Sequence, residues 1–515
     1  MALFTNSLGQ YSSSLYETAR TLLRSRNNQA VRAERIKQEN RQLRASLEQQ
    51  QRCLDQAKHD LREAHAEIQS LCEQQRQCRN RVPTLRGDLP LPGHQYGAAT
   101  IALCLNLARR IGFRPAVSAL QIVFEAFGII SKIPTAETIR TWACRAGVAV
   151  LGEPPEEADD WIWMVDHSNQ VGQEKVLQVL AIRAKDLPPP GQTLAREQLR
   201  PLAVRPGIQW KRDDMRQVYR ELQAIHGTPK FLLSDGAVEL RESADVLQNA
   251  ERSTIVLGDF KHFAANALER ILKSNDRFQS YLSWLGRSRS TVQQTELCHL
   301  TPPTLKTKAR FMNLGPVLRW GQMLSYQASH PRSRSRQGVT AKRFNEKFGW
   351  IRGYREDLSI WSRCQRVIQI GLRLINREGL AHGTAKKLRK AFEDECQDQP
   401  ACEVCDRLIE TLIEFVLANE SKLATRDRAW LSTENMESSF GAFKQLEGQQ
   451  SKGGLTSLVS AMPMVLRRWD ASSVRTCLSS ISTKQMRAWV EDNLGQTLNS
   501  KRRIAFAEAS LESLG

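Results

Sequence analysis

Hydrophobic positions recur at heptad spacing through a polar stretch, free of Pro and Gly, from about residue 15 to 80. One seam of the repeat contains Asn40, Leu47, Leu54, Leu61 and Ile68, and the other contains Ile36, Leu43, Gln50, Ala57, Ala64 and Leu71. This spacing predicts a coiled coil within residues 1–85, through which copies of the chain form a homo-oligomer. A single charged helix that folds back on the body of the protein is the alternative.

A short linker rich in Pro and Gly follows, and apolar residues then recur at the spacing of amphipathic helices. Three such helices are expected between about residues 98 and 147, inside a small helical domain over residues 88–150. Thr135 is placed to cap the third helix, because its side-chain oxygen can accept a hydrogen bond from the first turn.

The turn at Thr135 and the helix after it resemble the recognition helix of a helix-turn-helix. On this interpretation Arg140 and Arg145 face DNA, while Ile139 and Trp142 face the core of the domain. The alternative is a three-helix packing module that does not contact DNA.

From residue 161 onward the pattern changes to short, strongly apolar runs that are typical of strands. Four strands are expected within residues 161–168, 175–184, 230–236 and 253–260, with a helix over residues 237–251. Strands that alternate with helices indicate an α/β core. We expect core segments at residues 155–270 and 428–470, a helical insertion at 271–427 and a helical tail at 471–515.

The charge of the chain points to a polyanionic partner. Its 515 residues include 74 Lys and Arg against 55 Asp and Glu, a net charge of +19. Nucleic acid is the first candidate. A membrane surface is the second, although no apolar stretch approaches the ~20 residues that span a bilayer. The first residues lack the pattern of a secretory signal, so we expect a cytoplasmic protein associated with the nucleoid.

Acidic residues at the ends of predicted strands are the candidate catalytic groups. Asp166 closes an apolar run, where a carboxylate is costly unless it is paired or binds a metal. Asp235 follows the third strand, although an ordinary Asp-Gly turn would also explain it. The third acid is Glu437 or Glu434, on a helix expected near residue 430. Glu437 is preferred because Lys444 lies two turns further along the same face, where it can contact a phosphate.

These residues, in this order, resemble the DDE transposases of bacterial insertion sequences. Asp166, Asp235 and Glu437 match the acid triad, with a long helical insertion before the Glu. The stretch from Asp259 to His262 resembles the (C/D)xxH motif of several transposase superfamilies, and residues 433–438 resemble the segment around the third acid. Asp259 could instead cap a helix, and His262 could be a hydrogen-bonded core residue.

The resemblance implies an α/β RNase H-like core with a large all-α insertion. It also implies that the three acids hold two Mg²⁺ ions, for which Mn²⁺ can substitute. The expected reaction is cleavage of double-stranded DNA at the ends of an element, followed by strand transfer into target DNA. A DNA-binding protein derived from a transposase but without activity, and a metal nuclease on the same core, are the alternatives.

The middle of the predicted insertion is strongly basic. Fourteen Lys and Arg lie between Arg287 and Arg355, opposed only by Glu296 and Glu346. The flexible run that carries Arg332, Arg334 and Arg336 is expected to bind phosphates.

Zinc binding is a weaker possibility further along the insertion. Cys402 and Cys405 have the spacing of zinc ligands, and Cys396 and His382 are the nearest additional donors. Burial as small apolar side chains is the favoured interpretation of these cysteines.

Overall fold

The structure is a computed structural model in which two compact units are distinguished, residues 1–86 and 87–515. The residues that it describes are 15–79, 88–129, 132–171, 173–251, 253–304, 311, 314–332, 338–397, 399–449, 454–495, 497, 500–502 and 504–506.

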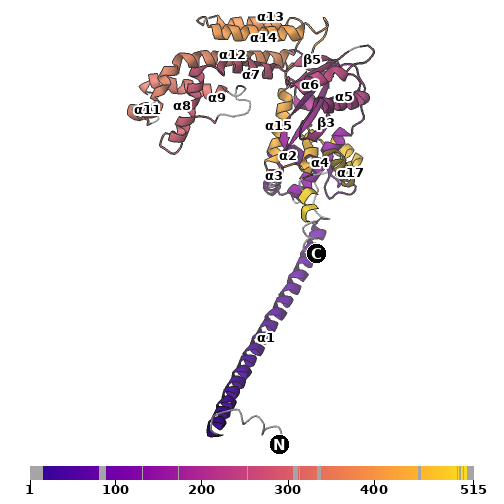
Figure 1. The fold of residues 1–515 in the computed structure, drawn as a ribbon. Helices are drawn as coiled ribbons and strands as arrows, with labels where there is room; N and C mark the ends of the chain where they lie inside the picture. The colour runs from indigo at the N-terminus through magenta and orange to yellow at the C-terminus, as the bar shows by residue number, and fades with distance from the viewer. Residues whose placement is uncertain are drawn as a thin grey trace. The chain divides into compact units, whose positions relative to one another are not determined.

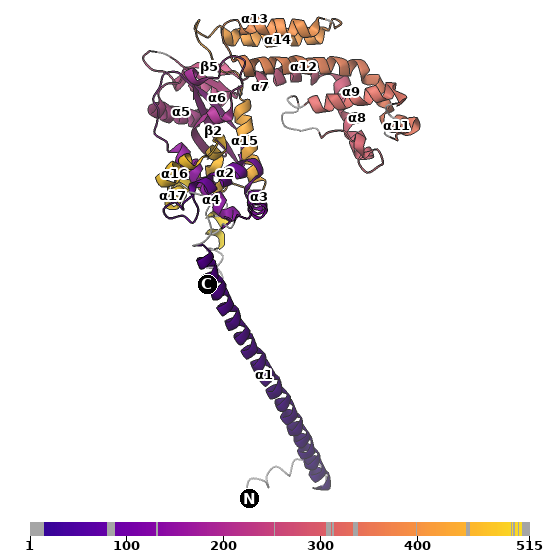
Figure 2. The same cartoon turned by 180° about the vertical axis from the view of Figure 1, so that it is seen from behind.

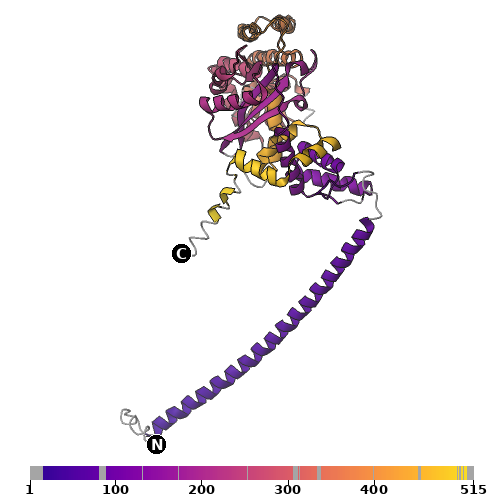
Figure 3. The same ribbon diagram turned by 90° about the vertical axis from the view of Figure 1, so that its right-hand side faces the viewer.

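The first unit contains one helix of 65 residues, α1 (Leu15–Arg79). At ~1.5 Å per residue it is about 100 Å long, and Figure 3 shows it without a break. Seam residues such as Leu43, Leu47 and Leu61 are exposed along it. The predicted helix is therefore confirmed, while its pairing with a second copy stays a prediction.

The second unit begins with a group of helices, α2 (Ala98–Ile111), α3 (Phe113–Ala126) and α4 (Ala136–Leu151). As predicted, Thr135 caps α4 and accepts a hydrogen bond of 3.1 Å from the Thr138 N–H. Ile139 and Trp142 are buried, also as predicted. A Cβ added at Gly147 would lie 1.9 Å from the carbonyl oxygen of Ser460, so only Gly allows the approach of this later segment.

In the described part of the chain, the named strands form one mixed sheet of five in the order β3-β2-β1-β4-β5. The strands are β1 (Trp161–Val171), β2 (Glu174–Arg183), β3 (Arg200–Gly207), β4 (Phe231–Ser234) and β5 (Ile255–Gly258). The first three pair antiparallel, and β4 and β5 continue the sheet parallel to β1. Four strands coincide with the predicted ones, and β3 was not predicted.

Alternating side chains of the strands fill two separate hydrophobic clusters. On one face, Trp163 and Leu232 pack with residues of α5 (Arg212–His226) and α6 (Val238–Glu242). On the other face, Met164 joins the large core that includes α4 and α15 (Glu434–Glu447). Helices therefore cover both faces of the sheet. The helix predicted over residues 237–251 is wrong in length, since α6 ends at Glu242 and a short 3-10 turn follows.

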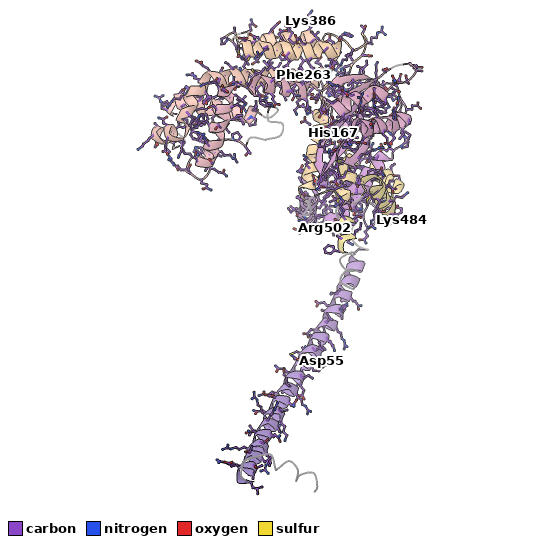
Figure 4. The ribbon with its side chains drawn as sticks, viewed as in Figure 1. Asp55, His167, Phe263, Lys386, Lys484 and Arg502 are labelled. Carbon is purple, nitrogen blue, oxygen red and sulfur yellow. The ribbon has the colours of Figure 1, made fainter. Side chains whose placement is uncertain are left out.

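A long helical insertion separates β5 from α15 (Figures 1 and 2). Its helices are α7 (Phe260–Leu272), α8 (Asp276–Val292), α9 (Gly315–Ser329), α11 (Ala341–Phe348), α12 (Arg355–Glu378), α13 (Thr384–Cys396) and α14 (Glu403–Glu420). Phe263 of α7, labelled in Figure 4, stacks on Phe415 of α14 with ring centroids 4.0 Å apart. The structure therefore agrees with the expected α/β core with a helical insertion.

After α15 the chain returns to the first helices of the unit. A 3-10 segment, η8 (Ser457–Leu466), packs against α4, and α16 (Ala471–Ser480) and α17 (Thr483–Leu494) also contact α4. Among the described residues, no helix combines the length and the apolar character that crossing a membrane requires.

Candidate active site at the edge of the sheet

The register of two parallel strands places the first two candidate acids side by side. Val165 of β1 pairs with Ser234 of β4, and Asp166 and Asp235 are the next residue on each strand. Asp166 is only 2% exposed. Asp235 turns the chain after β4, and its Oδ1 accepts a hydrogen bond of 3.0 Å from the Ala237 N–H. The two carboxyl groups therefore lie at one edge of the sheet.

A buried glutamine completes the surroundings of Asp166. Gln178 of β2 is the antiparallel partner of Asp166, so both side chains extend from the same face of the sheet. Its Oε1 accepts a hydrogen bond of 3.3 Å from the hydroxyl of Ser439 on α15. Gln178 thus connects the strand that carries Asp166 to the helix that carries the third candidate acid. Sequence analysis missed Gln178 because only the register identifies it.

Helix α15 brings Glu437 and Glu434 next to a lysine of α7. The Lys261 Nζ lies 2.7 Å from Glu437 Oε2 and 3.2 Å from Glu434 Oε1. Burial lowers the pKa of Lys261, but the two carboxylates outweigh that effect and raise it. Glu434 also accepts a hydrogen bond from Asn376. Lys261 lies within the predicted motif, yet no role was predicted for it.

The other oxygen of Glu437 is in a different state. Its Oε1 is buried and accepts no hydrogen bond from any residue that the structure describes. A buried acceptor in this state is costly, which points to a donor or a cation that occupies the site in another state.

Asp259 ties the beginning of the insertion to its end. It is buried, and its Oδ1 accepts a hydrogen bond from the His262 N–H, so it caps α7, which was the alternative considered for this residue. Its Oδ2 accepts a hydrogen bond of 2.8 Å from the Thr433 hydroxyl, 174 residues away. The backbone N–H of Thr433 also donates a hydrogen bond to Asp259 Oδ2. Together these two hydrogen bonds fix the start of α15 beside α7.

His262 forms a close ionic contact with Asp259. The His262 Nδ1 lies 3.0 Å from Asp259 Oδ1. Burial lowers the pKa of His262, but the hydrogen bond and charge of Asp259 outweigh it, with further contributions from Asp235 and Glu437, and raise that pKa. Asp235 after β4 and Glu437 on α15 therefore both lie close enough to act on the same histidine.

A second histidine follows Asp166 on β1 and extends from the opposite face of the sheet. His167, labelled in Figure 4, is buried, and its Nε2 lies 2.8 Å from Glu239 Oε1 on α6. This pair belongs to the face covered by α5 and α6, so it supports the strand rather than the acid cluster.

The carboxylates have the donor type that hard divalent cations prefer, but their present spacing does not form a metal site. Within the described residues, no group of three or more His, Cys, Asp and Glu could hold a metal ion. Asp166 and Asp235 are neighbours, whereas one oxygen of Glu437 is bound to Lys261. The three carboxylates therefore have the right donor atoms and the right place in the fold for a divalent cation. Their side chains are not arranged to bind one in this structure.

The predicted DNA-facing role of Arg145 is wrong. Its side chain is buried, and its guanidinium donates hydrogen bonds to the carbonyl oxygens of Ile481, at 2.9 Å, and Leu478, at 2.8 Å. Arg145 therefore joins α4 to α16 and to the residue after it. Arg140 is partly exposed and donates hydrogen bonds to Ser457, at 2.7 Å, and Glu137, at 2.9 Å.

The remaining candidate DNA-binding residues have different outcomes. Lys444 of α15 is exposed, seven residues after Glu437 on the same helix. Arg332 is exposed after α9, while Arg334 and Arg336 lie outside the residues that the structure describes. Contact of these residues with DNA stays a prediction.

Within the described residues, the donors considered for zinc are not gathered into one group. Cys405 lies 3.4 Å from Cys364, sulfur to sulfur, while the His382 Nε2 lies 3.0 Å from the carbonyl oxygen of Leu423. As stated above, the described side chains contain no group that could hold a metal. The cysteines instead belong to the helical packing of the insertion.

Comparison with known proteins gives distant structural similarity and no match in sequence. No protein-family model matches the chain, and no curated protein matches it. Among solved structures, a chain of the Drosophila P element transposase strand transfer complex aligns over 79% of this chain and 100% of its own length, with a TM-score of 0.39 and 11% identity. A similarity this distant does not establish a family, so the functional argument depends on the geometry of the site.

Proposed function

We propose that this protein is a DDE-type transposase with an RNase H-like core, which cleaves DNA at the ends of an element and transfers the strand into target DNA. The observation that carries the proposal is the placement of Asp166 and Asp235 on adjacent parallel strands, with α15 and Glu437 packed beside them. Asp235 and Glu437, which are remote in sequence, both contribute to the raised pKa of His262. Such convergence is typical of metal-dependent phosphoryl transfer.

In the proposed reaction, Asp166, Asp235 and Glu437 hold two Mg²⁺ ions, or Mn²⁺ in their place. Bound ions of this kind activate the attacking hydroxyl and stabilise the leaving oxygen of a phosphodiester. Gln178 and Ser439 keep Asp166 and α15 in a fixed relation. Asp259 and His262 hold the start of α7 against α15.

Lys261 has a second role in this proposal. Its ammonium group neutralises Glu437 and Glu434 in the arrangement described here. If Glu437 were to hold a cation, the Lys261 ammonium group would be left beside the acids, where it would be able to bind a phosphate oxygen of the DNA. Lys261 therefore positions the substrate and does not donate or accept a proton.

Double-stranded DNA is the proposed partner. The net charge of +19 supports it, and so does the basic stretch between Arg287 and Arg355 in the insertion. Lys444 and Arg332 are exposed candidates for phosphate contact. We further propose that copies of the chain associate through α1, because leucines of the heptad repeat are exposed along a single helix.

The decisive experiment uses the full chain and a DNA duplex that ends in the element's terminal sequence. In Mg²⁺, we expect the wild-type protein to nick the duplex and to join the freed 3′ end to a second DNA. Asp166→Asn should abolish both products and keep binding to the duplex nearly unchanged. Cleavage by Asp166→Asn at the wild-type rate would remove the basis of the proposal. Nicks without joined products would identify a metal nuclease.

A second candidate function follows from the ion pair of Lys261. A DNA-binding protein derived from a transposase, without activity, would keep the fold and lose the metal site. The absence of a metal-competent group among the described residues favours this candidate. Measuring Mn²⁺ binding by titration calorimetry separates the two. A transposase should bind Mn²⁺ in the wild type and lose that binding in Asp235→Asn, whereas an inactive derivative should show no binding that depends on Asp235.

A further inference from the structure

Two helices of the insertion bring three cysteines together away from the acid cluster. Cys364 lies on α12, and Cys402 and Cys405 lie at the start of α14, where Cys402 is the residue before the helix. The sulfur atoms of Cys364 and Cys405 are 3.4 Å apart, and both side chains are fully buried. The Cys-x-x-Cys spacing at a helix start brings Cys402 next to Cys405, one turn away.

A pocket gives small molecules access to one of these thiols. It has a volume of about 410 Å³, and Cys402, Arg363 and Pro400 are among its lining residues. Cys402 is partly exposed, in contrast to Cys364 and Cys405. An oxidant that enters this pocket therefore meets Cys402 first.

Arg363 adds a positive charge to the same place. Its side chain is only 6% exposed, and one amine donates a hydrogen bond to the Pro400 carbonyl oxygen. Its Nε is buried and has no hydrogen-bond partner among the described residues. A buried guanidinium with unused donor capacity beside a thiol stabilises the thiolate and the oxygen atoms added to it.

The pKa directions set the concentration of oxidant that is needed. Burial raises the pKa of Cys402, and the charge of Arg363 opposes this in part. The hydrogen bond with Cys364, followed by burial, raises the pKa of Cys405, which Arg363 also opposes. Both groups are mainly thiols at neutral pH, and because the thiolate is the species that reacts with peroxide, the oxidation is slow and needs a high peroxide concentration.

We propose that Cys364, Cys402 and Cys405 form an oxidation site, at which a peroxide oxidises Cys402 and the oxidation passes to a disulfide between Cys364 and Cys405. The product would tie α12 to α14 across the insertion. Metal binding is not favoured for the same cysteines, since the described residues contain no group that could hold a metal. The site is independent of the proposed transposase activity.

The reaction balances in three steps. Hydrogen peroxide transfers one oxygen atom to the Cys402 sulfur, which gives a sulfenic acid, and water leaves. The Cys405 thiol then attacks the Cys402 sulfur, which forms the Cys402–Cys405 disulfide and releases a second water. Finally the Cys364 thiol gives up its proton and attacks the Cys405 sulfur, and Cys402 leaves as a thiolate that takes a proton.

The full-length protein tests this proposal directly. It is treated with millimolar hydrogen peroxide, its remaining thiols are alkylated under denaturing conditions, and it is digested with trypsin without reduction. Trypsin releases Cys364 in the peptide 364–366 and the other cysteines in the peptide 391–407. We expect a mass that corresponds to these two peptides joined, preceded in time by the peptide 391–407 lighter by two hydrogens.

Matched variants assign each sulfur. Cys405→Ser should abolish the joined peptides, and Cys364→Ser should stop the reaction at the internal disulfide of the peptide 391–407. Cys402→Ser should slow the joining at least tenfold, because the two remaining thiols are buried. Cys298→Ser, which removes an exposed cysteine elsewhere in the insertion, should leave the rate unchanged. Thermal unfolding of each variant checks that it is folded.

Two results would overturn the proposal. One is full alkylation of Cys364 and Cys405 after Cys402 has been oxidised. The other is joining in Cys402→Ser at the wild-type rate, which would exclude the transfer through Cys402. Buried Cys477, between α4 and α16, serves as an internal standard that should stay reduced throughout.

Discussion

The carboxyl end of the sheet and helix α4 were both predicted to present functional side chains, and the structure brings the predicted residues together at the sheet but buries one of them on α4. At the sheet, Asp166 and Asp235 follow paired residues of neighbouring strands and lie together. On α4, Arg145 is buried against α16 and the residue that follows it. Both predictions used the periodicity of apolar residues along a short segment.

The difference lies in what each periodicity determines. In a strand, alternation fixes which side chains share a face, and parallel neighbours align their carboxyl ends whatever the sequence between them. In a helix, the apolar stripe shows one buried face but does not show whether another element covers the polar face. The carbonyl oxygens that bind Arg145 come from residues 333 and 336 positions later. Local sequence patterns therefore predict which side chains meet at strand ends better than they predict which helix faces are exposed.

The largest effect is expected from the third acid of the sheet edge. Glu437→Gln should reduce DNA cleavage by roughly two to three orders of magnitude, the loss typical of removing one electrostatic stabiliser of a transition state. Glu434→Gln is the matched control on the same helix, because Lys261 binds both residues. We expect it to retain cleavage within about tenfold. Initial rates of nicking in Mg²⁺ measure both, and the reverse order of losses would assign the role to Glu434.

The next largest effect is expected from the buried arginine of α4. Arg145→Ala should lower the free energy of unfolding by about 2–4 kcal/mol, because it removes the donors of one buried and one partly buried carbonyl oxygen. Denaturant unfolding of the full chain measures the loss. DNA affinity of the folded variant should equal that of the wild type. A variant with normal stability and weakened DNA binding would restore the original prediction for this residue.

The pair of Asp259 and His262 predicts a pH dependence of stability. Burial raises the pKa of Asp259, but the hydrogen bond and charge of His262 outweigh it and lower that pKa. The raised pKa of His262 means that its contribution is complete below pH 6.5 and is lost as pH rises through its folded value. The contribution of Asp259 is present above its ordinary pKa of 3.8 and is lost as pH falls through the lowered one.

The variant His262→Gln measures this contribution. Its unfolding free energy should fall below that of the wild type by about 1.5–3 kcal/mol, as for a hydrogen bond between charged groups, between roughly pH 4 and pH 6.5. The difference between the two proteins should shrink as the pH is raised further. A difference that is constant from pH 5 to pH 9 would mean that the pair is not ionic.

Much of the fold could be predicted from the sequence, and the exception has a physical reason. Apolar runs located β1, β2, β4 and β5, but β3 contains Pro201 and Pro206, which argue against a strand. The structure places β3 at the edge of the sheet. An edge strand needs only half of its N–H groups for pairing, so it tolerates proline. The strand β3 could therefore be predicted only if the order of strands in the sheet were known.

The site could be predicted in part. The acids were found because a carboxylate at the end of an apolar strand has few structural explanations. Gln178 and Lys261 were missed because a glutamine within a strand and a lysine within a helix are ordinary residues. Their roles come from cross-strand register and from a contact between helices 176 positions apart, and neither leaves a pattern in the local sequence.

The smallest effect is expected from Arg140, the arginine of α4 that remains partly exposed. Arg140→Ala should change the unfolding free energy by less than about 1 kcal/mol, because its partner Glu137 is largely exposed. If α4 contacts DNA, the variant should bind a duplex more weakly at low salt. The slope of log affinity against log salt should then decrease in magnitude by about 1, which corresponds to the loss of one phosphate contact. Fluorescence anisotropy at several salt concentrations measures the slope, with Arg332→Ala in the insertion as the comparison. An unchanged slope for Arg140→Ala beside a reduced slope for Arg332→Ala would assign DNA binding to the insertion and leave α4 as a packing helix.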